Sequence, residues 1–413
     1  MTDKNTKRQF RILAVIIILD LLSATMTVPL FPVIITDPQL SIFGLDVAKS
    51  FKYWALTAIY VCYGIAQLIG APFFGGLSDK YGRKKILAFI FVMNIVQYFM
   101  IAISIINQSY ILLLISRTTA GFAGGTVFIQ QSAIADLSSK EDKAKNLGIV
   151  GIAFGIGLIL GPLMGTWLAD SANHPSFSLA TPFFAILIIN TLNLFLLGYF
   201  FKESLTEFNK DKFSIFQGLK NIYLAFSIKN WRILFITTTF VCAGLFFFLQ
   251  FFQVMLEDRF GFGLMEQGLT LAYSGLIMVL AQGVLLPMLT KRFGVSRLLV
   301  VFLPILASGY FMLAQAQSVA FLLVALFIMI SAQGICTPGL LAMVSNRANR
   351  NVQGATIGIN QSIQSFASII PATLATSFVA TNIKFPLLFG TVVTFLAFFV
   401  FFWFEFRHRK DEN

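Results

Sequence analysis

The chain has 413 residues, of which 57% are hydrophobic and only 12% are charged, and its formal net charge is +12. Soluble domains carry about 25% charged residues, so this composition excludes an ordinary soluble protein. The three cysteines lie inside apolar runs and the two histidines lie outside them, so no Cys/His set has the spacing of a metal site.

Apolar runs of about 20 residues recur along the whole chain, and each is long enough to cross a bilayer core of ~30 Å. Because a run in lipid must satisfy its own backbone hydrogen bonds, these runs predict helices. We expect an all-α polytopic membrane protein with twelve transmembrane helices. In chain order the predicted spans are residues 11–35, 52–75, 86–106, 109–136, 145–169, 179–201, 231–256, 266–289, 297–315, 319–344, 352–379 and 384–405.

The basic residues gather on one side of the predicted spans. Of the 30 Lys and Arg residues, 25 fall in connections on the side of the N-terminus, four fall on the other side, and Arg117 lies inside a span. The positive-inside rule then places both termini in the cytoplasm. Membrane topology therefore explains most of the net charge, and we expect no nucleic-acid partner.

A long polar connection separates two groups of six spans. We predict an N-terminal half over residues 1–201, a cytoplasmic linker over 202–230 and a C-terminal half over 231–413. Part of the linker, from about Phe213 to Phe226, alternates apolar and polar residues at helical spacing and suits a helix on the membrane surface. A simple tether is the interpretation that we favour.

An internal repeat indicates that the two halves are pseudo-symmetric. The stretch "SDKYGRKKIL" at 78–87 aligns without gaps to "TKRFGVSRLL" at 290–299. Lys291 replaces Asp79 in the second copy, so only the first copy keeps its full set of charges. Two halves related by an axis along the membrane normal predict alternating access around a central cavity.

The first copy combines glycines and charges in a way that suits a gate. Gly75 permits close helix approach, and Gly82 permits a turn with positive φ. Asp79 suits a neighbouring helix N-terminus, and Arg83 suits a bidentate pair with a carboxylate. A merely basic turn would explain the lysines but not the spacing of glycine and aspartate.

This stretch, "GGLSDKYGRKKIL", resembles the signature loop of the major facilitator superfamily. "RTTAGFAGG" at 117–125 resembles the pattern of helix 4 in that family. The resemblance covers about residues 10–405 and is closest to the branch of the tetracycline/proton antiporters. It implies that an acid at the end of helix 4, here Asp136, pairs with Arg83 as a cytoplasmic latch.

The stretch "GIAFGIGLILGPLMG" in helix 5 resembles the glycine–proline motif of exporters in the drug/proton antiporter group. Small residues four apart form a flat helix face, and a proline weakens the helix by freeing a carbonyl. Ordinary small-residue packing between helices is the alternative. The motif residues are Gly155, Gly161, Pro162 and Gly165.

Two ionisable residues lie at membrane depth, where charge is costly and is a functional hypothesis by default. Asp20 in helix 1 and Arg117 in helix 4 lie at similar predicted heights. An aspartate that alternates between this arginine and water takes up and releases a proton, which is the minimum machinery for proton coupling. The alternatives are a permanently ionised pair, or an Asp20 that only caps polar backbone near Pro29.

Polar side chains in apolar spans mark the predicted substrate cavity, because the resemblance places their helices around it. Instead of contacting substrate, the glutamines could make hydrogen bonds between helices, and the phenylalanine could simply face lipid. Gln97 stands where the tetracycline branch carries an acid, so tetracycline as the substrate does not carry over. The cavity candidates are Gln67, Gln131, Phe248, Gln250, Gln253, Gln333, Gln361 and Gln364.

Together these features predict a transporter of the bacterial inner membrane. We expect it to export a small organic compound, drug-like or a secreted metabolite such as a siderophore, by proton antiport. Its expected partners are that substrate, protons and membrane lipid, and we expect a monomer. A proton-coupled importer of a small nutrient is the alternative. The third hypothesis is a transporter-like sensor or scaffold that transports nothing. Without a catalytic set or a phosphate-binding loop, we expect neither an enzyme nor a cofactor besides the proton gradient.

Overall fold

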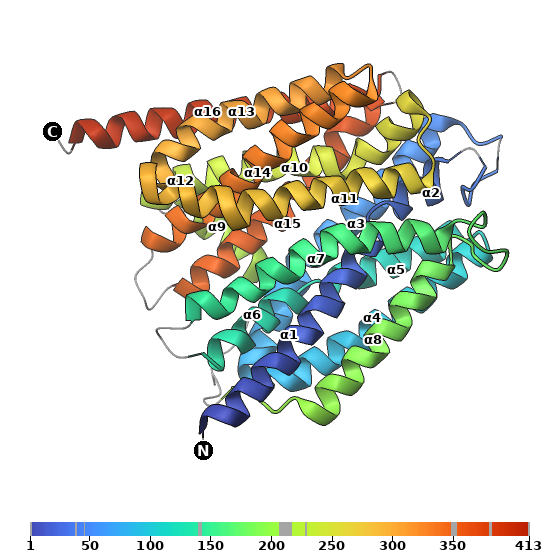
Figure 1. Ribbon diagram of the computed structural model, residues 1–413, viewed down its shortest axis with the longest axis horizontal. Helices are drawn as coiled ribbons and strands as arrows, with labels where there is room; N and C mark the ends of the chain where they lie inside the picture. The colour runs from blue at the N-terminus through green and yellow to red at the C-terminus, as the bar shows by residue number, and fades with distance from the viewer. Residues whose placement is uncertain are drawn as a thin grey trace. The chain divides into compact units, whose positions relative to one another are not determined.

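The computed structural model describes residues 2–37, 39–44, 46–138, 143–205, 217–227, 229–347, 353–379 and 382–411. These residues form helices and connections without a strand (Figure 1). Within them, eleven helical segments are long and apolar enough to cross a membrane. The one predicted span not among them, the eleventh at 352–379, corresponds to α15, Gln353–Val379, several side chains of which lie outside the described part. The prediction of an all-α polytopic membrane protein is confirmed.

The chain divides into two compact units, and unit 1 comprises Met1–Leu45, Ile65–Gln217 and Gly263–Gly275. Helix α1 packs against α7 and α8, and α4 packs against α5 and α8. Phe74 and Phe91 lie in the apolar core of this unit. Its helices are α1 Thr2–Met26, α2 Leu30–Thr36, the second part of α3 Lys49–Tyr81, α4 Arg83–Ile106, α5 Tyr110–Phe122, α6 Thr126–Asp136, α7 Lys143–Ala169, α8 Thr181–Phe200 and the first part of α11 Leu264–Leu280.

Unit 2 comprises Asp46–Gly64, Gly218–Phe262 and Leu276–Asn413. Helix α10 packs against α14, α15 and α16, and α13 packs against α14 and α16. Phe251 and Tyr310 are fully buried there. Besides the first part of α3, the end of α11 and α15, its elements are α9 Gln217–Ser227, α10 Lys229–Phe260, the π-helix η1 Ala281–Leu285, α12 Leu286–Phe293, α13 Val295–Gln315, α14 Val319–Arg347 and α16 Phe385–Asp411.

These units group residues by contact, whereas the predicted halves group them by sequence order. Helices α3 and α11 each contribute to both units. The predicted boundaries at residues 201 and 231 therefore stay a prediction. Residues 206–216 and 228 of the predicted linker lie outside the described part of the chain.

Helix α9 occupies the described end of the predicted linker. Its Asn221 is buried and donates a hydrogen bond to Ser362 of α15 over 3.3 Å. Ala225 is also buried, while Leu219 and Tyr223 are exposed. This segment is therefore a helix with one face on α15, and the interpretation of the linker as a tether stays a prediction.

Three of the predicted spans are interrupted. The span at 11–35 breaks at residues 27–29, where Pro29 has no N–H to continue the helix. The span at 109–136 breaks at 123–125. The eighth span contains the π-helical turn at 281–285 rather than a continuous α-helix. A continuous apolar run predicts membrane depth but does not reveal such breaks.

The break at 123–125 lies where α3 comes close. A Cβ atom at Gly70 of α3 would overlap the backbone of Phe122. Only glycine therefore lets α3 touch the end of α5 backbone to backbone. The contact is a property of the packed helices and leaves no mark in hydropathy.

The two copies of the internal repeat share one backbone turn. Gly82 has φ 104° and ψ 145° between α3 and α4, and Gly294 has φ 75° and ψ 154° between α12 and α13. Residues with a Cβ atom disfavour this positive-φ backbone conformation, so each copy needs its glycine. The positive φ predicted for Gly82 is confirmed.

Candidate functional site: a buried arginine, a buried aspartate and a polar pocket

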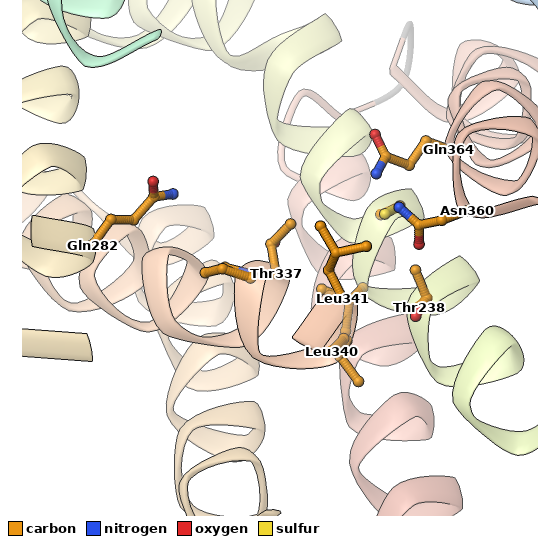
Figure 2. A pocket seen from close by; sticks show the side chains of 10 residues that line it. Thr238, Gln282, Thr337, Leu340, Leu341, Asn360 and Gln364 are labelled. Atoms are coloured by element: carbon orange, nitrogen blue, oxygen red, sulfur yellow. The ribbon is translucent and has the colours of Figure 1, made fainter. Parts of the chain in front are cut away.

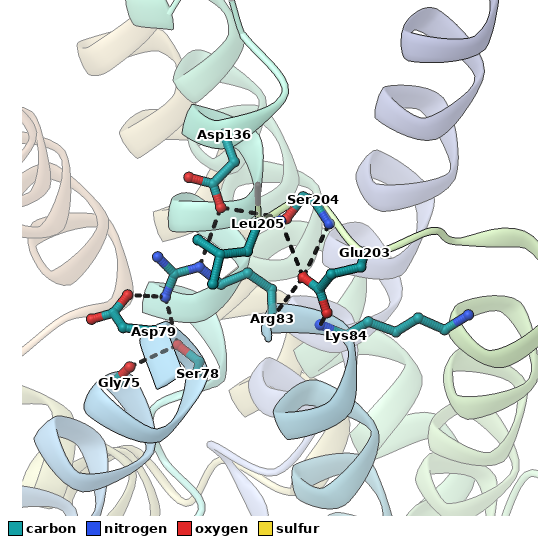
Figure 3. A network of polar contacts seen from close by, with 9 residues as sticks. All are labelled: Gly75, Ser78, Asp79, Arg83, Lys84, Asp136, Glu203, Ser204 and Leu205. Carbon is teal, nitrogen blue, oxygen red and sulfur yellow. Dashed lines mark hydrogen bonds and ion pairs between the residues drawn. The ribbon is translucent and has the colours of Figure 1, made fainter. Parts of the chain in front are cut away.

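A buried guanidinium is contacted by polar groups from two other helices. Arg83, the first residue of α4, is only 8% exposed. Its Nη1 lies 2.5 Å from Asp79 Oδ1 and donates to Ser78 Oγ over 2.6 Å (Figure 3). Its Nε donates to Asp136 Oδ2 over 3.2 Å. Burying an unpaired guanidinium is costly, so these partners fix its position. The predicted contact between Arg83 and Asp136 is present.

A further carboxylate caps the helix that Arg83 begins. Glu203 follows the end of α8 and accepts from the backbone N–H of Arg83 at Oε1 over 2.9 Å and from that of Lys84 at Oε2 over 3.1 Å. The first amides of a helix have no partner within it and carry a partial positive charge, which an anion satisfies. Ser204 Oγ donates to Asp136 Oδ2 over 3.4 Å and joins this cap to the arginine. We call Ser78, Asp79, Arg83, Asp136 and Glu203 the Arg83 cluster.

Two expectations for this stretch are corrected. The acid at the helix N-terminus is Glu203, whereas Asp79 pairs with Arg83 four residues along the chain. A Cβ atom at Gly75 would meet no described atom within 4 Å, so close helix approach does not explain this glycine in the structure. The added Cβ of Gly82 would overlap the Glu203 carboxylate, so this glycine also makes room for the cap.

The glycines of the exporter-like motif lie along α1. Thr25 Oγ1 of α1 donates to Gly157 O over 2.7 Å. A Cβ atom at Gly161 would lie 2.8 Å from Thr25 Cβ and 2.9 Å from Met26 N, and one at Gly165 would overlap the Met26 carbonyl. Helices α1 and α7 therefore meet backbone to backbone along this stripe.

The proline of the same motif serves another contact of α7. Pro162 has no N–H, so the Leu158 carbonyl receives no helical hydrogen bond. A Cβ atom at Gly275 of α11 would lie 2.8 Å from this carbonyl oxygen. Thr166 Oγ1 donates to Pro162 O over 2.8 Å, and Gly155 is buried on the same helix. The motif thus fits α7 closely to both α1 and the first part of α11.

The buried aspartate of α1 has a neutral partner. Asp20 is 8% exposed, and Gln130 Nε2 of α6 donates to its Oδ2 over 2.9 Å. Gln130 itself is fully buried. The sequence singled out the neighbouring Gln131 for the cavity, but only the packing of α6 on α1 decides which of the two amides reaches Asp20.

Arg117 lies against an aromatic ring. Its guanidinium carbon is 4.0 Å from the centre of the Phe31 ring in α2, which is a cation–π contact. The break between α1 and α2 immediately precedes this part of α2. The pairing of Arg117 with Asp20 stays a prediction.

Two of the cavity candidates of unit 2 make contacts to other protein groups. Gln250 Nε2 donates to Ser368 O over 2.8 Å and so ties α10 to α15, as the interhelical alternative predicts. Phe248 packs against Phe252 with ring centres 4.4 Å apart, and Gln253 is buried. Elsewhere, Gln67 lies beside the break at 123–125, because its Nε2 is 2.9 Å from a Cβ built at Gly124. For Gln131 and Gln361, which are half-buried, the cavity role stays a prediction.

Unit 2 contains a pocket of about 150 Å³ (Figure 2). Among the cavity candidates, Gln364 lines it directly. Gln333 lies one contact behind the wall, because its Nε2 donates to the pocket residue Thr337 over 2.6 Å. The lining residues come from α10, η1, α14 and α15 and are Thr238, Val241, Cys242, Gln282, Thr337, Pro338, Leu340, Leu341, Asn360 and Gln364.

Comparison with known proteins extends over nearly the whole chain. The family model described as the Major Facilitator Superfamily matches residues 13–372 and 283–413. The chain is 28% identical over 373 residues to the tetracycline resistance protein, class C, of Escherichia coli, covering 88% of each. It is 25% identical over 423 residues to the quinolone resistance protein NorA of Staphylococcus aureus, covering 98% of this chain and 99% of the relative.

Solved structures share the fold at lower identity. The human organic anion transporter MFSD10 has a TM-score of 0.71 at 20% identity, covering 96% of this chain and 99% of that one. A D-xylose-proton symporter has a TM-score of 0.73 at 16% identity, covering 96% of each. At these identities the likeness concerns the fold alone.

Replacing Glu203 tests the cap at the start of α4 in two steps. Glu203→Gln removes the charge and one of the two acceptor oxygens, so we expect the free energy of unfolding to fall by about 0.3–1 kcal/mol. Glu203→Ala removes the charge and both acceptor oxygens, and we expect a fall of about 1–2 kcal/mol. Unfolding of the purified protein in detergent measures both. An alanine variant no weaker than the glutamine variant would contradict the cap.

Two alanine substitutions on α7 should act in opposite directions. Gly161→Ala forces α7 away from Thr25 and Met26, and we expect a loss of about 1–3 kcal/mol in the free energy of unfolding. Gly151→Ala is the matched control, because its Cβ would meet no described atom within 4 Å, and higher helix propensity should stabilise it by up to about 1 kcal/mol. Equal effects in thermal unfolding would refute close packing at Gly161.

Proposed function

The chain belongs to the Major Facilitator Superfamily, and from that premise we propose that it is a secondary active transporter that exports a small organic compound in exchange for protons. The observation that carries this proposal is the similarity, along most of the chain, to proteins named for resistance to tetracycline and to quinolones. A membrane transporter gives resistance when it moves the compound out of the cell. Drug-like molecules and secreted metabolites both suit this role.

We place proton exchange at Asp20. A buried carboxyl group held by the neutral amide of Gln130 loses its charge without leaving a buried cation unpaired. This geometry supports exchange over a permanently ionised structural pair. In the proposed cycle Asp20 turns between Gln130, Arg117 and water, and each setting favours one of its two charge forms.

We assign the Arg83 cluster to a gate on the cytoplasmic side. It holds together the ends of α3, α4 and α6 and residues 203–204. The strong bias of Lys and Arg toward this side supports a cytoplasmic location for the cluster and for both termini in a bacterial inner membrane. Opening of the gate would exchange the contacts of Arg83 for water.

Import by proton symport is the less supported direction. Neither Asp20 nor the Arg83 cluster encodes a direction, since both serve a cycle that runs either way. The likeness to a D-xylose-proton symporter is at 16% identity and concerns the fold. The relatives that share more sequence are named for resistance, which favours export.

Replacing Asp20 with asparagine tests the proposed exchange. Expressed in an efflux-deficient bacterium, the wild type should lower the accumulation of at least one of tetracycline, norfloxacin and ethidium. That compound should also trigger proton release from the purified wild type. In Asp20→Asn we expect at least a tenfold loss of transport and no proton signal, because an amide does not gain or lose a proton near neutral pH.

Asp170→Asn is the matched control, because this aspartate lies in a connection outside the spans and accepts from the backbone of Ala172. It should keep both signals. If Asp20→Asn retains the full proton signal, coupling through Asp20 is wrong. If the wild type excludes no compound from the panel and a deletion strain instead requires a nutrient, export is wrong.

A further inference from the structure

The pocket in unit 2 is formed by matching helix faces. Thr238 and Cys242 of α10 lie four residues apart, as do Asn360 and Gln364 of α15, so each pair shares one face of its helix. Figure 2 shows the two amides at one end of the pocket and Gln282 at the other. None of the residues that line the pocket is charged. The site therefore suits a neutral group with polar edges.

The amides of Asn360 and Gln364 are uncommitted. Asn360 is only 5% exposed and Gln364 is half-buried, and in the described part of the chain neither side-chain amide makes a hydrogen bond. Buried amides in folded proteins are normally hydrogen-bonded. Two amides side by side without partners present both donors and acceptors to whatever fills the pocket.

A chain of hydrogen bonds leaves a third donor at the pocket. Tyr310 donates from its hydroxyl to Gln333 Oε1 over 3.2 Å, and Gln333 Nε2 donates to Thr337 Oγ1 over 2.6 Å. The Thr337 oxygen is thus an acceptor, and its own proton remains to be donated. Thr238 differs, because its hydroxyl donates to Leu234 O over 2.9 Å. Among the described residues, none accepts a hydrogen bond from the Thr337 hydroxyl.

The π-helical turn shapes the opposite end of the pocket. An extra residue in a helical turn rotates the side chains that follow by roughly 100°. Gln282 lies in this turn, and a Cβ atom at Gly334 of α14 would lie 2.8 Å from Ala281 Cβ and 3.7 Å from Gln282 Cγ. The absence of a side chain at Gly334 therefore lets the turn and Gln282 approach α14. Such turns occur frequently at functional sites.

We propose that this pocket is a substrate subsite for an uncharged, ring-sized planar group with a hydrogen-bond donor and acceptor on one edge, such as an aryl carboxamide. A cavity of about 150 Å³ holds roughly one six-membered ring, whereas whole drug sites are several times larger. The apolar walls from α10 and α14 cover the ring faces, and the amides of α15 with the Thr337 hydroxyl bind its polar edge. The inference rests on the proposed export function and names the chemistry of one part of its substrate.

Fragment binding to the purified full chain in detergent tests the subsite. The probes are benzamide, which has the proposed edge, and benzoate, which has the same shape and a negative charge. Saturation-transfer NMR should detect benzamide with the wild type, and at least a fivefold loss of that signal with Asn360→Leu/Gln364→Leu. Gln315→Leu, which removes an exposed amide from α13 in the same unit, is the matched control and should bind as the wild type does. Thr337→Val is a second variant with an intact amide pair, and we expect a weaker signal from it.

Benzamide binding that is equal in the wild type and in the folded double variant overturns the proposal, as does an absence of variant-sensitive binding. Benzoate binding as strong as that of benzamide overturns the neutral selectivity. If the double variant fails to fold, an unchanged signal in Thr337→Val overturns the assigned edge. The assay uses no gradient and no export, so a protein that binds benzamide here but exports nothing would contradict the proposed function and leave the subsite standing.

Discussion

The end of unit 1 that carries the signature loop depends on the burial of one cation. Arg83 is almost fully buried, so other protein groups must balance its positive charge and accept hydrogen bonds from its N–H groups. Asp79, Asp136 and Ser78 do this from two other helices, while Glu203 satisfies the backbone of the same residue. One side chain therefore fixes the ends of α3, α4 and α6 relative to one another. Helices that cross lipid without a hydrophobic driving force between them need such polar contacts at their ends.

The sequence predicted only those members of this cluster that lie in recognisable motifs. Arg83 and Asp136 could be paired in advance because each sits in a stretch that resembles the family pattern. Glu203 could not, because it lies 120 residues from Arg83 in a polar connection with no periodicity. The same limit applies to Gln130 and Gln131, which are equivalent in composition until the rotation of α6 on α1 distinguishes them. A motif predicts which chemistry a segment carries, whereas a partner from a distant segment is decided only by packing.

The interruptions of the spans mark a second limit. Hydropathy indicates membrane depth, and it did not divide the runs at 11–35, 109–136 and 266–289 at their breaks. Local signals do stand at the breaks: Pro29 at the first, Gly124 and Gly125 at the second, and Pro287, which has no N–H, two residues after η1. The predicted number and order of the spans therefore agree well with the structure, while the local departures, including η1 with Gln282, are not visible in hydropathy.

An amide is one of the few neutral groups that match both forms of a carboxyl group. Ionised Asp20 requires a donor, which Gln130 supplies from Nε2. A protonated Asp20 also offers a donor, and the same amide supplies the acceptor once its terminal group turns over. Gln130 Oε1 has no hydrogen bond to any described residue, so this turn breaks no other contact. Under the proposed exchange, arrival of a proton would therefore leave the spacing of α1 and α6 intact, because the same amide serves both forms of the carboxyl group, and movement of these helices would require the loss of this contact.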